Sequence, residues 1–328
     1  MCPTARECAW SFTSIMLLLA TATVARGAAL DQLYWTEWDA NAQNAIRRSN
    51  IDGGDLTTIA SGSGGNVGNP PHYFGPVGIA VDMPAGYVYW ADISGNKITR
   101  SNLDGSDPTT IGASTDPFAL TLDTRHGKLY WSDETEDRIY MANLDGSQPQ
   151  AIVTSGALYV QGLAVDSLGG KLYWTDVHTD SVKRADLDGT NVETLVSGYQ
   201  YQAPSGLALD LTHGKMYWAD WATYKIVRAN LDGSSVEDFV AGLSHPGPLA
   251  IDPLSQLLYC LDWGSDRMLR VDLSTRDIVT IATRSGISSL SGIAYARVPE
   301  PGGGVLLLIG VVSVLSGRRL QVAWGHRS

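Results

Sequence analysis

The stretch GLAVDSLGGKLYWTDVHTDSVKRADLDGTNVETLV, residues 162–196, contains one complete structural unit of this protein. Four short segments of apolar or alternating residues are separated in it by turns rich in Gly and Asp, the last of which is Asp188-Gly189. Short alternating segments bounded by such turns are typical of β-strands. The stretch therefore predicts one four-stranded antiparallel sheet.

The motif Tyr-Trp-small-acid inside this unit recurs along the sequence. The six copies begin at Tyr34, Tyr89, Tyr130, Tyr173, Tyr217 and Tyr259, and the last one reads YCLD. Successive copies are 55, 41, 43, 44 and 42 residues apart. A period near 40 residues indicates a repeat array whose units bury their apolar faces against one another. Four strands in each unit is the pattern of a β-propeller blade.

The two ends of the array complement each other. The array starts with a Tyr-Trp strand at Leu33 and finishes with an inner-strand pattern, GIAYA, at Gly292. A blade built from both ends closes the ring and leaves no open sheet edge. We predict an all-β fold over residues 29–297, a six-bladed β-propeller of four-stranded antiparallel blades with one blade closed by both chain ends.

These repeats resemble the class B (YWTD) repeats of the low-density-lipoprotein receptor family. The resemblance covers residues 30–297, and four Leu-Asp-Gly turns accompany the six YW-acid copies. Those turns contain Asp104, Asp145, Asp188 and Asp232. The resemblance implies a six-bladed propeller, but it implies no particular ligand, because fold and function separate readily.

Physical reasoning assigns the signature mainly structural roles. Adjacent Tyr and Trp residues point to opposite faces of a strand, so both rings are expected between blades. The signature acids are expected to form ion pairs, with Arg47 or Arg48 serving Glu37. The other expected pairs are Asp92–Arg100, Asp176–Arg184, Asp220–Arg228 and Asp262–Arg270. We interpret the Leu-Asp-Gly segments as turns rather than calcium loops, and Cys260 as a buried apolar residue.

The two terminal segments are typical of targeting signals. Residues 1–27 are typical of a secretory signal peptide. Residues 298–328 contain Val298, Pro299, Glu300 and Pro301, then a hydrophobic segment at 304–317, expected to be a helix, and then Arg318 and Arg319. This order is similar to the PEP-CTERM sorting signal of Gram-negative bacteria, with a glycolipid-anchor signal as the alternative.

That similarity implies a partner and a location. An exosortase-type processing enzyme would recognise the tail of a protein exported across the inner membrane. The protein would be anchored there transiently, contact the membrane only through this segment, and reach the cell surface or extracellular matrix.

Charge and cysteine content agree with export. The formal net charge is −11, which disfavours nucleic acid and anionic membranes as partners. Two of the three cysteines, Cys2 and Cys8, lie in the predicted signal peptide, so Cys260 has no partner for an internal disulfide.

The sequence offers no catalytic motif, and we predict no catalytic residue, metal site or cofactor. The alternative is an extracytoplasmic hydrolase of the calcium-lactonase type, which needs Glu, Asn and Asp side chains pointing into the central channel. The acids that recur in the inner strands lie at their far ends, where they are expected to cap turns. They are Asp82, Asp123, Asp166, Asp210 and Asp252.

Candidate ligand-binding residues lie in loops on one rim of the propeller. The candidates are Trp38, Trp221 and Trp263 directly after a signature acid, Tyr224, the acids Glu134 and Glu136, and Tyr73 and Phe74 in an insert at 61–76. In the receptor family, aromatic residues at such positions form an apolar patch that holds protein ligands. The alternative is that these rings pack onto neighbouring loops.

We therefore predict a secreted, non-catalytic binding module with a matrix or adhesion role, whose ligand is an extracellular protein or polysaccharide. A scaffold without a specific ligand is a further alternative.

Overall fold

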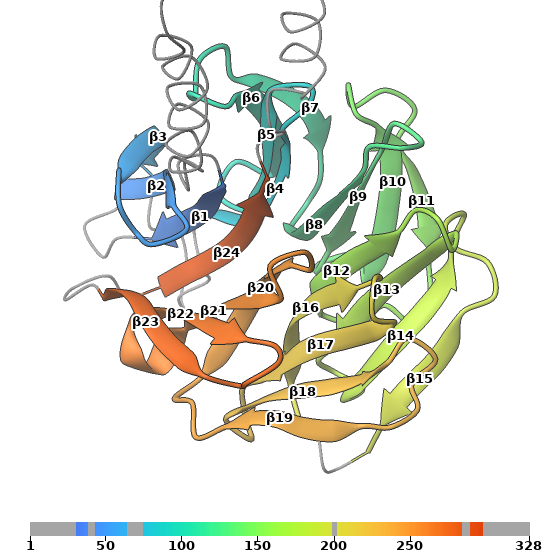
Figure 1. The fold of residues 1–328 in the computed structure, drawn as a ribbon. Coiled ribbons are helices and arrows are strands. Elements are labelled where there is room, and N and C mark those ends of the chain that lie inside the picture. Colours follow the sequence, from blue (N-terminus) through green and yellow to red (C-terminus); the bar gives the residue numbers. More distant parts are fainter. Residues whose placement is uncertain (1–30, 39–42, 64–74, 199–201, 284–288, 298–328) are drawn as a thin grey trace, which may run out of the picture.

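Six four-stranded antiparallel sheets are arranged around a central axis in the computed structural model (Figure 1). The structure describes residues 31–38, 43–63, 75–198, 202–283 and 289–297. The predicted all-β six-bladed propeller is confirmed over these residues. The predicted signal peptide, the sorting tail with its hydrophobic helix, and most of the insert lie outside them.

Each blade contributes one strand to each of four concentric layers. The innermost strands are β24 (Ser289–Ala296), β4 (Pro76–Asp82), β8 (Pro117–Asp123), β12 (Val160–Asp166), β16 (Pro204–Asp210) and β20 (Pro246–Asp252). The second strands, which hold the signature, are β1 (Gln32–Trp38), β5 (Tyr87–Asp92), β9 (Lys128–Asp133), β13 (Lys171–Asp176), β17 (Lys215–Asp220) and β21 (Leu257–Asp262). The third strands are β2 (Gln43–Asn50), β6 (Lys97–Asn102), β10 (Arg138–Asn143), β14 (Ser181–Asp186), β18 (Lys225–Asn230) and β22 (Arg267–Asp272). The outermost strands are β3 (Thr57–Ser63), β7 (Thr109–Ala113), β11 (Gln150–Val153), β15 (Glu193–Ser197), β19 (Glu237–Ala241) and β23 (Ile278–Thr283). We call the blade of β24 and β1–β3 blade A, and we letter the other five blades from B to F in sequence order.

Blade A joins the two ends of the described residues. Strand β1 pairs antiparallel with β24, so that Gln32 lies opposite Ala296 and Trp38 lies opposite Ser289. The predicted closure by residues near Gly292 is confirmed.

The ring has two different ends. One end, the turn face, carries the turns from first to second strand and from third to fourth strand of each blade. The other end, the loop face, carries the loops from second to third strand and the connections from each blade to the next. Each signature acid is the last residue of its second strand or, for Glu37, the next to last, and therefore lies under the loop face.

The rings of the signature fill the spaces between blades, as expected. Trp174 packs with Tyr130 and Leu163 between blades C and D. Its neighbour Tyr173 packs on the opposite side of β13 with Leu207 and other residues between blades D and E. One signature residue thus serves each of the two interfaces that a blade makes.

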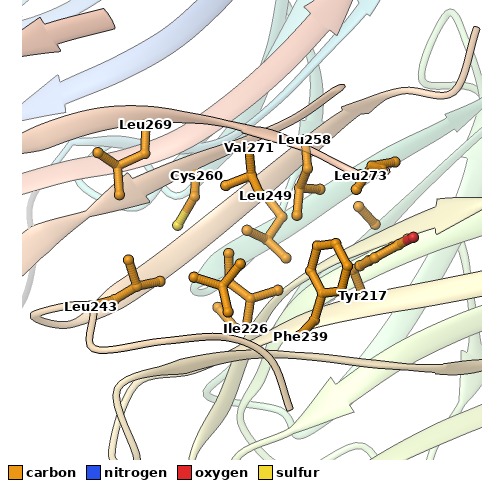
Figure 2. Close-up of a cluster of buried hydrophobic side chains, with 13 residues drawn as sticks. Tyr217, Ile226, Phe239, Leu243, Leu249, Leu258, Cys260, Leu269, Val271 and Leu273 are labelled. Atoms are coloured by element: carbon orange, nitrogen blue, oxygen red, sulfur yellow. The ribbon is translucent and has the colours of Figure 1, made fainter. Parts of the chain in front are cut away.

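Cys260 replaces the signature Trp in blade F and lies in the apolar cluster between blades E and F (Figure 2). It is fully buried beside Leu249 and Leu269, and this burial raises the pKa of its thiol far above the usual value. The thiol is an apolar packing group, as the sequence predicted.

The Leu-Asp-Gly turns hold consecutive blades together. A Cβ atom on Gly146 would lie 1.6 Å from the carbonyl oxygen of Ile111, on the outermost strand of the preceding blade. Gly146 also has a φ of 84°, which non-glycine residues rarely adopt. Asp145 accepts a hydrogen bond from the backbone N–H of Ser147, at 2.9 Å, and so closes the turn. The interpretation of these segments as structural turns is confirmed.

The predicted ion pairs between signature acids and the arginines eight residues later are wrong. Strand register places Arg184 opposite Tyr173 instead of Asp176. There, the Arg184 Nη1 atom donates to the carbonyl oxygen of Leu231 in the next blade, at 3.0 Å, and the guanidinium pairs with Glu193. Asp92, Asp220 and Asp262 are separated from their expected partners by the same register. Only the pairing of Glu37 with Arg47, at 2.6 Å, is confirmed.

Across the part of the protein that the structure describes, no helix has the length and apolar character needed to cross a membrane.

Candidate binding site on the loop face

The signature acids position the loops above them. Asp262 is fully buried, and its Oδ1 atom accepts hydrogen bonds from the backbone N–H groups of Ser244, at 3.0 Å, and His245, at 2.7 Å. Its Oδ2 atom accepts from the hydroxyl of Ser265, at 2.5 Å, in the other loop of the same blade. One carboxylate thereby ties the loop that enters blade F to the loop between its second and third strands.

Asp133 does the same in blade C. Its Oδ2 atom accepts hydrogen bonds from the Ser114 hydroxyl, at 2.6 Å, and from the Thr115 N–H, at 2.8 Å. Burial alone would raise the pKa of Asp133, but these hydrogen bonds outweigh it and lower that pKa below the ordinary value. Asp133 is therefore an ionised anchor for its loops, whereas burial raises the pKa of Asp220, the equivalent acid of blade E. In both blades C and F the carboxylate fixes the loops above it through hydrogen bonds.

Four aromatic residues meet where blades E and F adjoin. Trp221 and Tyr224, on the loop between β17 and β18, both contact His245 on the connection into blade F. The ring centroids are 5.9 Å apart for Trp221 and 5.1 Å apart for Tyr224. The backbone N–H of Trp263 donates to the carbonyl oxygen of His245, at 2.9 Å. We call Trp221, Tyr224, His245 and Trp263 the aromatic cluster.

The members of the aromatic cluster differ in exposure. Trp221 is 38% exposed and Tyr224 is 45% exposed, which is high for such large apolar groups. Trp263 lies in the short 3₁₀ helix η1 (Trp263–Ser265) and is half-buried, with its indole directly over Gly247. Trp263 thus matches the alternative in which the ring packs onto its neighbours, while Trp221 and Tyr224 remain available to a ligand.

Tyr224 has an unusual backbone conformation. Its φ is 61°, in the left-handed region. The equivalent loop residues of four other blades, with φ between 47° and 52°, are Asn or Asp: Asn96, Asp137, Asp180 and Asp266. Asn and Asp tolerate this conformation, whereas a bulky side chain there costs about 1–3 kcal/mol. A tyrosine kept at this position at such a cost is typical of a functional residue.

Two blades away, Glu134 occupies the position that Trp221 and Trp263 occupy in their blades. One of its carboxylate oxygens, Oε1, is buried and has no hydrogen-bond partner among the described residues. Burial, followed by the negative charges of Asp116, Asp133 and Asp137, raises the pKa of Glu134 to about 8. This carboxyl group is therefore largely protonated at neutral pH, and a cationic group of a ligand would favour its ionised form.

Glu136, the other predicted acid, already has partners within its own blade. Its carboxylate accepts hydrogen bonds from Arg138, at 3.2 Å, from Thr115, at 3.3 Å, and from the hydroxyl of Tyr140. The structure therefore places Glu136 in a local network at the edge of the loop face.

The three remaining predicted residues lie at the edge of the described ranges or outside them. Trp38 ends β1 on the loop face, and Tyr73 and Phe74 are outside the described residues. His245, whose contacts with Trp221 and Tyr224 connect the cluster, was not among the predicted site residues. Its signal in the sequence is its place directly before Pro246, at the entry to an inner strand.

The central channel contains a cavity of about 360 Å³ lined by the six inner strands. Its polar side chains among the described lining residues are Thr121, Gln161, Ser291 and Tyr295, and no carboxylate is among them. The recurring acids instead cap turns; for example, Asp123 accepts from the backbone N–H of His126, at 3.1 Å. The donor set expected of a calcium lactonase is thus not present in this lining. Within the described ranges, no three His, Cys, Asp or Glu side chains are grouped to hold a metal ion.

Comparison with known proteins agrees with this architecture. The family model for the low-density lipoprotein receptor repeat class B matches residues 170–211 and 214–253, in blades D to F. A stretch of 77 residues is 35% identical to low-density lipoprotein receptor-related protein 1 of Pyricularia oryzae. That match covers 23% of this chain and 23% of the relative. The protein therefore contains class B repeats, but it matches only a small part of this relative.

Two solved structures share the whole propeller. A chain in the crystal structure of a nidogen/laminin complex superposes with a TM-score of 0.70 at 25% identity, covering 81% of this chain and 98% of that one. Virginiamycin B lyase from Staphylococcus aureus superposes with a TM-score of 0.57 at 16% identity, covering 81% of this chain and 91% of the lyase. The second likeness shows the fold alone, and the first is to a chain whose structure was solved in a protein complex.

Proposed function

We propose that this protein is an extracellular binding module that holds a protein ligand on its loop face, through Trp221 and Tyr224 of the aromatic cluster. The observation that carries the proposal is the exposed, left-handed Tyr224 in contact with His245. The structure solved as a nidogen/laminin complex supports a protein as the ligand. Exposed aromatic residues on a fixed base are typical of the residues that dominate binding energy at interfaces.

Acidic groups also contribute to the chemistry of the loop face. The protein carries a net charge of −11, and Glu134 lies on the same face with a buried carboxylate oxygen that no described residue satisfies. A ligand that presents an apolar group to Trp221 and a cationic group to the acids would match both features. We therefore propose a ligand segment with both properties, in a matrix or adhesion setting.

The proposal is tested by capture on immobilised protein. Extracellular matrix material of the producing cells would be passed over the full-length protein and over the Trp221→Ala and Tyr224→Ala variants. We expect each variant to lose roughly tenfold in affinity or more, because truncating a central aromatic contact costs about 2 kcal/mol. Leu254→Ala is the matched control, since Leu254 is 67% exposed but lies on the turn face.

The outcomes separate the alternatives. Capture that is lost when the material is treated with protease identifies a protein ligand, and capture that is lost only after glycosidase treatment identifies a polysaccharide. Equal capture by wild-type protein and both loop-face variants would contradict the site. Equal loss in Leu254→Ala would show that the effect is not specific to the loop face.

We also propose that the protein is exported and sorted through residues 298–328. The motif Val298-Pro299-Glu300-Pro301 and the arginines Arg318 and Arg319 would be read by an exosortase-type enzyme while the apolar segment is in the inner membrane of a Gram-negative bacterium. The product would then reach the cell surface or matrix. Mass spectrometry of the secreted product should show that both terminal segments are removed. A Glu300→Gln variant should keep its tail and remain in the membrane fraction, and an unchanged mature mass would contradict the sorting signal.

A further inference from the structure

The turns that join the first and second strands of blades B to F surround the turn-face end of the central channel. We call them the inner turns, and they comprise residues 83–86, 124–127, 167–170, 211–214 and 253–256. In blade A the two chain ends take the place of this turn, because its first strand is β24 and its second strand is β1. Arg297, which follows β24 and is exposed, therefore lies beside the inner turns.

The inner turns contain no acidic residue, although the net charge of the protein is −11. Four of the five acids that precede them are at most 5% exposed, and these are Asp82, Asp123, Asp210 and Asp252. The turns between third and fourth strands, which lie farther from the axis, each carry an exposed Asp. These residues are Asp52, Asp104, Asp145, Asp188, Asp232 and Asp277. The acidic charge of the turn face is therefore concentrated at its periphery.

Leucine side chains protrude from the inner turns of three consecutive blades. Leu168 is 77% exposed, Leu254 is 67% exposed and Leu211 is 40% exposed. Leu168 and Leu254 hold equivalent positions on turns that a buried or half-buried carboxylate closes. The backbone N–H of Leu168 donates to Asp166 Oδ1, at 3.1 Å, and that of Leu254 donates to Asp252 Oδ1, also at 3.1 Å. One exposed leucine is ordinary, but three around one opening indicate an apolar contact surface.

The chain beyond Arg297 indicates what this surface contacts. Six residues, 298–303, connect Arg297 to the hydrophobic segment 304–317. Six residues extend over at most about 21 Å. A helix of the length of 304–317 measures about 21 Å, which is less than the roughly 30 Å of a bilayer's hydrocarbon core. A short apolar segment on a short connection would therefore draw the turn face onto the surface of any membrane that it enters.

We propose that the inner turns rest on a lipid bilayer while the hydrophobic segment is in the membrane, with Leu168, Leu211 and Leu254 inserted among the lipids. This inference rests on the proposed sorting function and adds a second membrane contact to it. Single side chains that protrude from separate turns suit a lipid surface, because lipids deform around them, whereas a folded partner would need a matching pocket for each. Arg125, which is also exposed on an inner turn, can reach the phosphates of the headgroups.

The first test is photo-crosslinking of the full-length protein in vesicles of zwitterionic phosphatidylcholine, since the acidic periphery disfavours anionic lipids. The photoreactive amino acid p-benzoylphenylalanine would replace Leu254. In a matched control it would replace Tyr159, which is 39% exposed on the loop face. We expect mass spectrometry to find lipid adducts at position 254 and none at position 159.

The second test compares how two double variants partition onto the same vesicles. Leu168→Glu combined with Leu254→Glu should weaken partitioning by at least roughly tenfold, because two leucine side chains no longer leave water. Val192→Glu combined with Ile278→Glu adds the same charge at the periphery of the turn face, where these side chains are 45% and 44% exposed. This control should stay within roughly twofold of wild type. All four positions are exposed, so both variants should keep the near-ultraviolet circular dichroism spectrum of wild type.

The outcomes separate this inference from the proposed sorting function. Wild-type protein that does not associate with the vesicles would contradict both. Wild-type protein that associates, forms no lipid adduct at position 254 and partitions no better than the Leu168→Glu, Leu254→Glu variant would contradict the inference alone. Adducts between position 254 and residues 304–317 would assign the inner turns to the chain's own hydrophobic segment, and adducts to a second copy would assign them to a dimer. Either result would overturn the lipid contact.

Discussion

On the turn face, five blades repeat one glycine turn, whereas on the loop face the residue after the signature acid is Trp in three blades and Ile, Glu or Val in the other three. The turn-face glycines have φ values between 83° and 85°, and they are Gly53, Gly105, Gly146, Gly189 and Gly233. The loop-face residues are Trp38, Ile93, Glu134, Val177, Trp221 and Trp263. A residue repeated in five of the six blades reflects packing between blades, since these blades pack on their neighbours in the same way. The differences between blades therefore locate the residues that are available for recognition.

The largest expected effect concerns the buried ion pair beneath the loop face, and it tests how much that pair contributes to the free energy of unfolding. Lys183→Met would leave the buried carboxylate of Asp176 without its ammonium partner. We expect a loss of about 3–5 kcal/mol in the free energy of unfolding, measured by denaturant titration. Lys171→Met is the matched control, because its ion pair with Asp186 is partly exposed and should be worth at most about 1 kcal/mol. Equal losses in both variants would contradict the structural role of the buried pair.

The next test concerns the turn face alone. Gly146→Ala would place a Cβ atom against the Ile111 carbonyl oxygen and force an unfavourable φ, and we expect it to cost about 3 kcal/mol. Gly127→Ala has a similar positive φ of 66° but no heavy atom within 4 Å of the new Cβ, so it should cost only about 1 kcal/mol. The difference between the two unfolding free energies measures the contact between blades. If the two costs were the same, the contact would have no role in the repetition of this turn.

A smaller effect distinguishes the loop face by its response to pH. Burial and the neighbouring acids raise the pKa of Glu134 to about 8, from an ordinary value of 4.5. The folded state therefore holds a proton that the unfolded state releases between about pH 4.5 and 8, and Glu134 reduces stability progressively over this interval as the pH rises. We expect Glu134→Gln to remove this decline, and to be more stable than wild type at pH 8.5 by on the order of 2 kcal/mol.

Glu136→Gln is the comparison for this measurement, since Glu136 is more exposed and already hydrogen-bonded. Thermal unfolding of the three proteins from pH 4 to pH 9 gives the required curves. Parallel curves for wild type and Glu134→Gln would contradict the raised pKa.

The smallest effect joins stability to recognition. Tyr224→Asn places at this loop position the residue type that blade B has at Asn96. We expect a gain of roughly 1 kcal/mol in the free energy of unfolding, because Asn adopts the left-handed conformation more easily. The same variant should bind the loop-face ligand less well. A variant that gains stability and keeps full binding would show that Tyr224 has no part in recognition.

The repeated part of the molecule was predictable because it depends on local patterns. The six signature copies and the complementary ends at Leu33 and Gly292 were sufficient for the ring and its closure. Strand register was not predictable from residue spacing, which is why Arg184 was assigned to Asp176 rather than to Tyr173 and Glu193. The register between two strands depends on the geometry of the turn that joins them, and the number of residues between two side chains does not give that geometry.

The candidate site was predictable only in part, because its members come together through packing between blades. Trp221 and Tyr224 were recognisable from their positions after a signature acid. The contact of both rings with His245, and the burial of Trp263 against Gly247, depend on how blades E and F pack.

The pairing of β1 with β24 also determines how the molecule presents itself. Gln32 and Ala296 lie opposite each other at the turn-face end of blade A. The described residues at both ends therefore lie on the side away from Trp221 and Tyr224. A tether that continued in that direction would leave the aromatic cluster on the opposite face, open to a partner.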